Sequence, residues 1–455
     1  MLVRLHITNF LSFKEEAEFC MIADPSLKQH DNHKINVGAN RVDLLKSSII
    51  YGANGAGKSN LVQALLFFKH IVNNGKVSKE VSTQKYRFGG TEDPMTLEVE
   101  IAIAQSFYTY GIQFTDNLVV GEWLYLTSNI KRPIKIYNRT YDEAKNQPTI
   151  DFDANYLFEN TSDKESDKYA LLISLMEENL LLNNELLLTK NQNFKSSHLE
   201  NVLNWFMDSL TIISPNSKAV TVAKLFEEYP HIKLKSEELI RSLNTGIDTF
   251  SIVRKDLDEY VLNSEFADPE ILTNLKEDLD RDSGNNTIAM KFKDKLILID
   301  REDNRYVIKE IVTNRTIGGK NYQFNLSDES DGTQRIIDLI PMIDSVISYP
   351  KVFVVDEMDR SLHPNLIYNF IKKVMSETTQ GQLIFTTHES SLLNCDLFRT
   401  DEIWFVEKNS ENQSTEIYSL NEFKPRLDMN LEKGYLNGRF GAIPFLSNLK
   451  DLNWS

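Results

Sequence analysis

Apolar and polar positions alternate at the start of the chain, so residues 2–8 (LVRLHIT) predict a first β-strand. A short apolar run at 47–51 (SSIIY) leads into a glycine-rich stretch, and apolar residues then recur at helical spacing from Asn60 to His70. The predicted order is strand, loop and helix. Residues 95–138 contain three further alternating segments separated by polar turns, which indicates an antiparallel β lobe.

The middle of the chain changes to helical periodicity. From about residue 160 to residue 283, apolar positions follow short helical patterns, one of which covers Pro269–Leu279. No heptad pattern lasts for the several repeats that a long coiled coil needs. Beyond residue 287 the strand pattern returns, and helices at 331–346 and 364–376 then alternate with strands at 351–355, 382–386, 402–407 and 414–418. Such alternation predicts a mostly parallel sheet.

These patterns predict an α/β protein in three parts. Residues 1–155 form the first half of a head that combines a mostly parallel sheet with the antiparallel β lobe. Residues 156–286 form an inserted helical domain, which we expect to serve as a sensor or as the contact for a partner. Residues 287–455 complete the head, so its sheet is built from both ends of the chain.

Composition narrows the class of protein. A chain of 455 residues with 41% hydrophobic and 25% charged residues is globular and long enough for two or three lobes. Its formal net charge of -16 gives no indication of nucleic-acid binding, since no basic cluster of useful length interrupts the acidic balance. There are only two cysteines, no signal-peptide core and no apolar run of membrane-spanning length. We therefore expect a cytoplasmic protein without a membrane partner.

The strongest chemical signal is residues 52–59 (GANGAGKS), which match the phosphate-loop pattern G-x-x-x-x-G-K-S. Glycines let backbone N–H groups turn toward a polyphosphate, and the following helix adds the positive end of its dipole. Lys58 would reach the β- and γ-phosphates, and the Ser59 hydroxyl would bind Mg²⁺. A chance glycine turn is the competing interpretation, and the flanking strand and helix argue against it. The residues expected to hold the nucleotide are Asn54, Gly55, Ala56, Gly57, Lys58, Ser59 and Asn60.

A second signal is the apolar strand Val352–Val355, which ends in adjacent carboxylates. Asp356 would hold Mg²⁺, and Glu357 would orient and deprotonate an attacking water. His388 follows another apolar strand, at the edge where open α/β sheets bind their ligands, and could contact the γ-phosphate. The competing interpretations are acids that cap a strand and a structural histidine.

Residues 326–335 (LSDESDGTQR) open a predicted helix with small hydroxyl residues and a glycine. The N-terminus of such a helix can bind an anion, which makes Ser330 and Gly332 candidate phosphate ligands. The same residues fit an ordinary helix cap, and the sequence leaves both interpretations open.

The order of these motifs resembles the ABC-type ATPases of the SMC, RecF and OLD-nuclease group, and residues 7–13 (ITNFLSF) look like that group's first strand and loop. The closing residues 438–444 (GRFGAIP) are similar to the end of the RloA-like and AriA-like ATPases of bacterial anti-phage systems. The resemblance covers roughly residues 1–127 and 287–445. It implies an ABC-type ATPase head with ATP and Mg²⁺ as its cofactors.

In that group two heads enclose ATP. The resemblance therefore implies a homo-oligomer that is at least a head-to-head dimer, and AriA-like proteins form a larger ring. Ser330 and Gly332 of one subunit would touch the γ-phosphate bound to Lys58 of the other. This sequence departs from the usual Leu-Ser-Gly-Gly-Gln signature at Asp331 and Thr333.

An ATPase head does not define a task, and three functions compete. The first is a defence ATPase that senses infection or stress, with a phage protein as trigger, and controls a separately encoded effector such as a Toprim nuclease. The second is a RecF/SMC-like DNA-repair or chromosome ATPase that acts on DNA itself, which the acidic balance disfavours. The third is a self-contained OLD-type nuclease, and too few residues follow His388 for its second domain.

Overall fold

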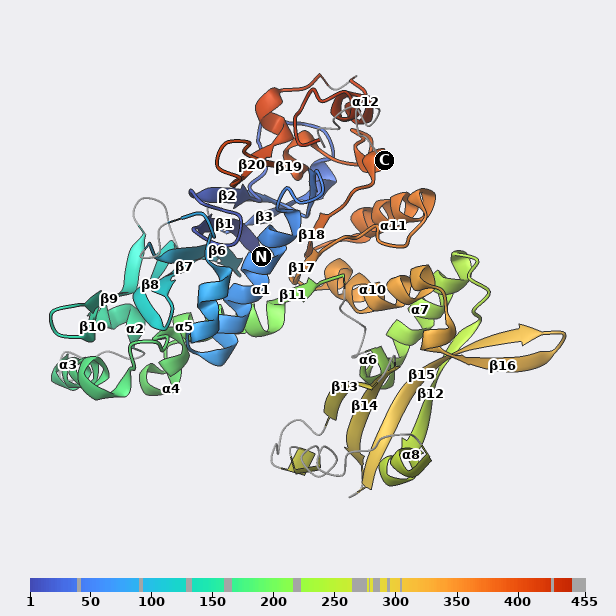
Figure 1. Ribbon diagram of the computed structural model, residues 1–455, viewed down its shortest axis with the longest axis horizontal. Helices are drawn as coiled ribbons and strands as arrows, with labels where there is room; N and C mark the ends of the chain where they lie inside the picture. The colour runs from blue at the N-terminus through green and yellow to red at the C-terminus, as the bar shows by residue number, and fades with distance from the viewer. Residues whose placement is uncertain are drawn as a thin grey trace, which may run out of the picture. The chain divides into compact units, whose positions relative to one another are not determined.

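The chain divides into two compact units. The first comprises Met1–Pro215, Val346–Met358 and Tyr368–Ser455, and the second comprises Asn216–Ser345 and Asp359–Ile367. Most of the predicted helix Pro269–Leu279 and the last residue of the 438–444 motif lie outside the described residues. The computed structural model (Figure 1) describes residues 1–38, 42–89, 93–127, 133–158, 166–215, 222–263, 276–277, 279–280, 287–292, 295–302, 305–426 and 429–443.

The first unit contains a six-stranded, mostly parallel sheet. Its strands are, in spatial order, β11 (Leu210–Ile213), β17 (Val352–Val355), β18 (Gln382–Thr386), β5 (Ser47–Gly52), β19 (Ile403–Lys408) and β20 (Thr415–Ser419). Neighbouring strands are parallel except for β19 and β20. Because β5 lies between β18 and β19, the sheet is built from both ends of the chain, as the strand and helix pattern predicts.

Strand β11 comes from the region predicted to be helical. Helix α5 (Ser197–Asn204) continues into the π-helical turn Trp205–Ser209, and the chain then enters β11 and pairs with β17. Helical structure therefore does not extend through the whole of residues 156–286. A four-residue apolar run (LTII) is too short for periodicity to separate a strand from the end of a helix.

The first unit also contains a seven-stranded antiparallel sheet, which confirms the β lobe predicted at 95–138. The first strand of the chain, β1 (Leu2–Thr8), joins this lobe as the neighbour of β6 (Met95–Ile103). Strands β3 (Lys34–Val37) and β4 (Val42–Leu45) pair separately. The seven strands are, in spatial order, β10 (Gln147–Phe152), β9 (Ile134–Asp142), β8 (Leu118–Thr127), β7 (Ser106–Thr115), β6 (Met95–Ile103), β1 (Leu2–Thr8) and β2 (Ala17–Cys20).

Helix α1 (Lys58–Asn74) packs its apolar face into the core of the first unit. The Phe68 ring lies 5.6 Å from the Tyr110 ring of the β lobe and 5.0 Å from the Phe206 ring, measured between centroids. Aromatic pairs at such distances stabilise a core beyond the area that they bury. The helix that begins at the predicted phosphate loop is therefore fixed to the body of the unit.

A buried glutamate joins residues 187–188 to the β lobe. Glu122 is 0% exposed, and its carboxylate accepts hydrogen bonds from the Tyr137 hydroxyl at 2.8 Å and from the backbone N–H groups of Leu187 at 2.7 Å and Leu188 at 2.9 Å. A carboxylate that is removed from water requires such donors, because an unpaired buried charge is costly. This segment therefore belongs to the first unit, although the sequence assigns it to a separate lobe.

The second unit contains an antiparallel sheet in the order β12 (Thr249–Asp256), β15 (Arg305–Ile317), β14 (Lys295–Glu302) and β13 (Thr287–Phe292), with β16 (Lys320–Asn325) paired to β15. Apolar side chains of helices α6 (Val222–Glu228), α7 (Pro230–Ser242) and α10 (Asp331–Ser348) form its core with this sheet. The division differs from the predicted parts 1–155, 156–286 and 287–455, because pairing of β12 with β15 joins residues on both sides of the predicted boundary.

The predicted helix at 364–376 is α11, which extends to Glu377. Among the helices that the structure describes, none combines the length and the hydropathy that crossing a bilayer requires. The remaining described α-helices are α2 (Ala154–Leu157), α3 (Ser166–Leu175), α4 (Asn191–Phe194), α8 (Leu257–Asn263) and α12 (Leu431–Leu436).

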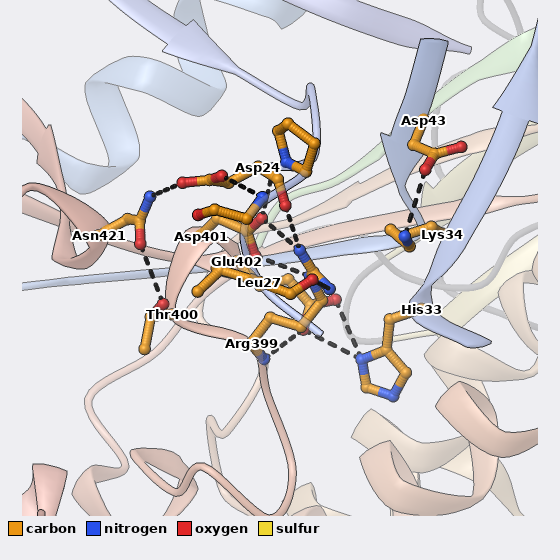
Figure 2. A network of polar contacts seen from close by, with 12 residues as sticks. Asp24, Leu27, His33, Lys34, Asp43, Arg399, Thr400, Asp401, Glu402 and Asn421 are labelled. Carbon is orange, nitrogen blue, oxygen red and sulfur yellow. Dashed lines mark hydrogen bonds and ion pairs between the residues drawn. The ribbon is translucent and has the colours of Figure 1, made fainter. Parts of the chain in front are cut away.

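A buried polar network fixes the start of β5 (Figure 2). The Arg399 guanidinium donates to Asp401 Oδ2 at 2.7 Å and is 0% exposed. The neighbouring Glu402 carboxylate accepts from the Ser47 hydroxyl at 2.6 Å and lies 3.0 Å from His33 Nδ1. These bonds connect the loop before β3, the first residue of β5 and the turn before β19, so the strand that leads into the phosphate loop is held at its beginning.

Candidate functional site

The predicted phosphate loop connects β5 to α1. Gly55 and Gly57 have φ angles of 77° and 115°, in the region where L side chains are strained. A Cβ atom on Gly57 would lie 2.3 Å from Thr415 Oγ1, a distance that real Cβ atoms do not adopt. The curled backbone of the loop therefore depends on these two glycines.

Lys58 is the first residue of α1 and is only 6% exposed. Its ammonium group donates to the carbonyl oxygens of Gly52 at 2.8 Å and Ala53 at 3.3 Å. The positive charge consequently lies within the curl of the loop, beside the positive end of the helix dipole. This combination attracts an anion.

The first turn of α1 is open at its N-terminus. Gly57 is the N-cap residue and provides no side-chain cap for the first N–H groups of the helix. Asn54, Gly55 and the hydroxyl-bearing Ser59 are exposed. Donor N–H groups, an ammonium and an accessible hydroxyl together fit a magnesium-bound polyphosphate, since Mg²⁺ prefers oxygen ligands and retains phosphate oxygens among them.

The strand register brings the acidic pair Asp356–Glu357 to the same edge of the sheet as the predicted phosphate loop. Strand β17 pairs in parallel with β18, and β18 pairs with β5 so that Thr386 lies opposite Ile50. Asp356 directly follows β17, and β5 ends at Gly52, where the phosphate loop starts. Both motifs therefore leave the sheet at the carboxyl ends of its strands, where open α/β sheets bind their ligands.

Thr386 connects the two acidic residues, a contact that the sequence did not predict. Its hydroxyl donates to Asp356 Oδ1 at 2.6 Å and accepts from the backbone N–H of Glu357 at 2.8 Å. Thr386 is 0% exposed and Asp356 is 2% exposed, so both bonds lie in a medium where hydrogen bonds are stronger than in water. The signal in the sequence that could have identified Thr386 is its place in the polar run Thr-Thr-His at the end of a buried strand.

Glu357 has a φ angle of 48°, which is rare for a residue with a side chain. Such a left-handed conformation costs on the order of 1–3 kcal/mol and is characteristic of functional sites. The hydrogen bond from its N–H to Thr386 helps to hold it. The half-buried side chain of Glu357 therefore starts from a fixed backbone, and its role as a general base stays a prediction.

Replacing Thr386 by valine (Thr386→Val) is expected to lower the kcat of ATP hydrolysis by about tenfold and to leave the affinity for MgATP nearly unchanged. The substitution keeps the shape of the side chain but removes the donor to Asp356 and the acceptor for Glu357 N–H. Steady-state hydrolysis and a binding titration measure the two quantities. An unchanged kcat in the folded variant would show that Thr386 does not position the acidic pair.

His388 is exposed and lies just beyond the end of β18. The residues on either side of it are tied to β5. The Thr387 N–H donates to the Ile50 carbonyl at 3.2 Å, and the Tyr51 hydroxyl donates to the Glu389 carbonyl at 3.0 Å. His388 is therefore held near the carboxyl edge of the sheet, and its contact with the γ-phosphate stays a prediction.

Ser330 and Gly332 belong to the second unit, at the start of α10. The Ser330 hydroxyl accepts from the Thr333 N–H at 3.3 Å, as expected for a helix cap. A Cβ atom on Gly332 would lie 2.6 Å from the Ser361 carbonyl oxygen, so the close approach of this turn requires glycine. Both residues have local structural roles, and their contact with phosphate stays a prediction.

Residues 47–196 and 214–394 match the family described as "AAA domain, putative AbiEii toxin, Type IV TA system". The sequence matches none of the curated proteins with which it was compared.

Three solved SMC head structures are similar over most of their lengths. An SMC head bound to the C-winged helix domain of ScpA shares 12% identity at a TM-score of 0.43, with 92% of this chain and 97% of that chain covered. The SMC head domain from Thermotoga maritima shares 14% identity at a TM-score of 0.36, with 92% of this chain and 98% of that chain covered. The third structure is an Smc head domain with an extended coiled coil, bound to the C-terminal domain of ScpA derived from Pyrococcus furiosus. It shares 12% identity at a TM-score of 0.37, with 93% of this chain and 99% of that chain covered.

Proposed function

The chain belongs to the family of AAA domains described as putative AbiEii toxin, Type IV TA system, and we propose that it binds ATP with Mg²⁺ and hydrolyses the terminal phosphate. The observation that carries this proposal is the shared edge of one parallel sheet. The phosphate loop follows β5, the Asp356–Glu357 pair follows β17, and the intervening strand β18 carries the hydroxyl that holds the pair.

In this proposal each side chain has a defined task. Lys58 neutralises the β- and γ-phosphates, while the backbone N–H groups of the loop and Asn60 surround them. Ser59 and Asp356 hold Mg²⁺, which offsets the negative charge of the phosphates. Glu357 takes the proton of the attacking water, and His388 contacts the γ-phosphate.

We further propose that ATP joins two copies of the chain, head to head or within a larger ring. Ser330 and Gly332 of one copy approach the γ-phosphate held by Lys58 of the other. Support comes from the N-terminus of α10, which begins at Asp331 directly after Ser330, because the positive end of a helix dipole favours an anion. ATP is then part of the interface, so binding promotes association and hydrolysis releases it.

The task we propose for the ATPase is control of a separate effector in anti-phage defence. The family description refers to a toxin system, and residues 438–444 are similar to the end of anti-phage ATPases. The effector would be a separately encoded protein such as a Toprim nuclease, with a phage protein as trigger. The net charge of -16 supports a protein partner over duplex DNA.

The purified chain tests this proposal directly. We expect MgATP hydrolysis that duplex DNA does not stimulate, an increase in molecular mass with a non-hydrolysed ATP analogue, and retention of the product of the adjacent gene on the tagged chain. Hydrolysis that requires DNA, with no retained partner protein, would favour a RecF/SMC-like DNA-repair ATPase instead. A folded chain that binds no MgATP would contradict both functions.

A further inference from the structure

We propose that Thr415 is a positioning residue of the phosphate loop, supported by Ser12, and this inference rests on the proposed ATP-binding function. Thr415 is the first residue of β20, far from the loop in sequence, and it is 5% exposed. Strand β19 pairs with β5 and with β20, with Val406 opposite Gly52 and Lys408 opposite Thr415. This pairing brings Thr415 to the loop.

The hydroxyl of Thr415 lies 2.8 Å from the Ala56 carbonyl oxygen and 2.6 Å from Ser12 Oγ. A carbonyl oxygen can only accept, so the single hydroxyl hydrogen of Thr415 is donated to Ala56. The Ser12 hydroxyl must then donate to Thr415. Ser12 Oγ accepts in turn from the Asn60 side-chain amide at 2.6 Å. With these directions each hydrogen of the relay meets one acceptor.

The relay orients one peptide group of the loop. In a planar trans peptide the C=O and the N–H point to opposite sides. The hydrogen bond from Thr415 to the Ala56 carbonyl consequently turns the Gly57 N–H away from Thr415. A hydrogen bond accepted by the carbonyl also polarises the N–H of the same peptide group. Thr415 therefore prepares Gly57 as a donor to a phosphate that it does not itself touch.

The space beside Gly57 confirms how closely the relay is fitted to the loop. A Cβ atom on Gly57 would lie 2.3 Å from Thr415 Oγ1 and 2.9 Å from Ser12 Oγ. The two hydroxyls occupy the place where a side chain of residue 57 would lie. The backbone of Thr415 adds a bond of 2.7 Å from its N–H to the Ser12 carbonyl, so strand β20 and the loop after β1 hold each other in place.

The test is the isosteric substitution Thr415→Val, which leaves the Ala56 carbonyl without its donor. We expect the dissociation constant for a non-hydrolysed MgATP analogue to rise about tenfold, with kcat at saturating MgATP changed by less than about twofold. Thr415→Ser keeps the hydroxyl and is expected to bind like the wild type. Ser12→Ala removes the bonds of the Ser12 hydroxyl to Thr415 and Asn60 but leaves the bond from Thr415 to the Ala56 carbonyl, so it is expected to have a smaller effect on binding.

Thr378→Val is the matched control. Thr378 is also a buried threonine of the first unit, and its hydroxyl donates to a carbonyl oxygen, that of Val374, at 2.7 Å. Thr378→Val should lower the unfolding temperature of the chain without changing its affinity for the nucleotide. If Thr415→Val is folded and binds the analogue as tightly as the wild type does, or if Thr415→Ser binds as weakly as Thr415→Val, the positioning role is overturned. A wild-type chain that binds no nucleotide would instead overturn the proposed function, and this inference with it.

Discussion

Replacing Lys58 by alanine (Lys58→Ala) is expected to weaken binding of MgATP by at least about a hundredfold, because a phosphate would lose its buried cationic partner. The ammonium group already lies inside the loop, where it donates to the Gly52 and Ala53 carbonyls and is 6% exposed. Exchange of these neutral acceptors for a phosphate gives a stronger, charge-assisted bond. A binding titration with the non-hydrolysed analogue measures the loss.

Lys69 provides a matched control for this prediction. It lies on the same helix, and its ammonium group also donates to two carbonyl oxygens, those of Leu210 at 2.6 Å and Met207 at 3.3 Å. Lys69→Ala removes an equivalent side chain away from the phosphate loop, so it should reduce stability and leave nucleotide affinity unchanged. Similar loss of binding in both variants would mean that Lys58 acts through the stability of α1 alone.

The parallel sheet could be predicted because its strands are short apolar runs followed by turn or chemical motifs. The runs that lead to Gly52, Asp356 and His388 are all strands, and they are neighbours in the order β17, β18 and β5. Strand β11 could not be predicted, since its four residues follow a helical pattern without a break. Its strand conformation comes from pairing with β17, a tertiary interaction that local periodicity does not encode.

The boundaries of the compact units could not be predicted for a related reason. Helical periodicity suggests one lobe from residue 156 to residue 286, but the structure divides this region between two cores. The Glu122 carboxylate binds the N–H groups of Leu187 and Leu188, and strand β12 pairs with β15. Both contacts join residues that are far apart in sequence. A change of composition along the chain therefore does not reveal which core each segment joins.

The residues proposed to contact the nucleotide could be predicted from the sequence, but the residues that hold them in place could not. Residues that meet the nucleotide follow a spacing that chemistry imposes, as in the pattern from Gly52 to Ser59. The positions of the Thr386 and Thr415 hydroxyls depend on how their strands pair with the neighbouring strands. This pairing is a tertiary property that no local spacing in the sequence encodes. Ser330 could have been a phosphate ligand or a helix cap on sequence grounds, and the hydrogen bond to Thr333 N–H accounts for the capping role.

Replacing Glu357 by glutamine (Glu357→Gln) is expected to preserve MgATP binding and to lower kcat by about 10²–10⁴-fold, the usual contribution of a general base. The amide has nearly the shape of the carboxylate but cannot accept the proton of the attacking water. Since the backbone N–H of Glu357 is held by Thr386, the substitution should leave the backbone at φ 48° in place. Single-turnover hydrolysis and an analogue titration separate the chemical step from binding.

The same variant also tests whether ATP holds two copies together. If hydrolysis opens the assembly, Glu357→Gln in MgATP should accumulate the larger species, whereas Lys58→Ala should stay at the mass found without nucleotide. Glu377→Gln serves as the control for loss of one negative charge, because Glu377 pairs with Lys373 on the surface of α11. Full turnover by Glu357→Gln would falsify its assignment as the base. Slow turnover without the larger species would retain that assignment and remove the link between ATP and assembly.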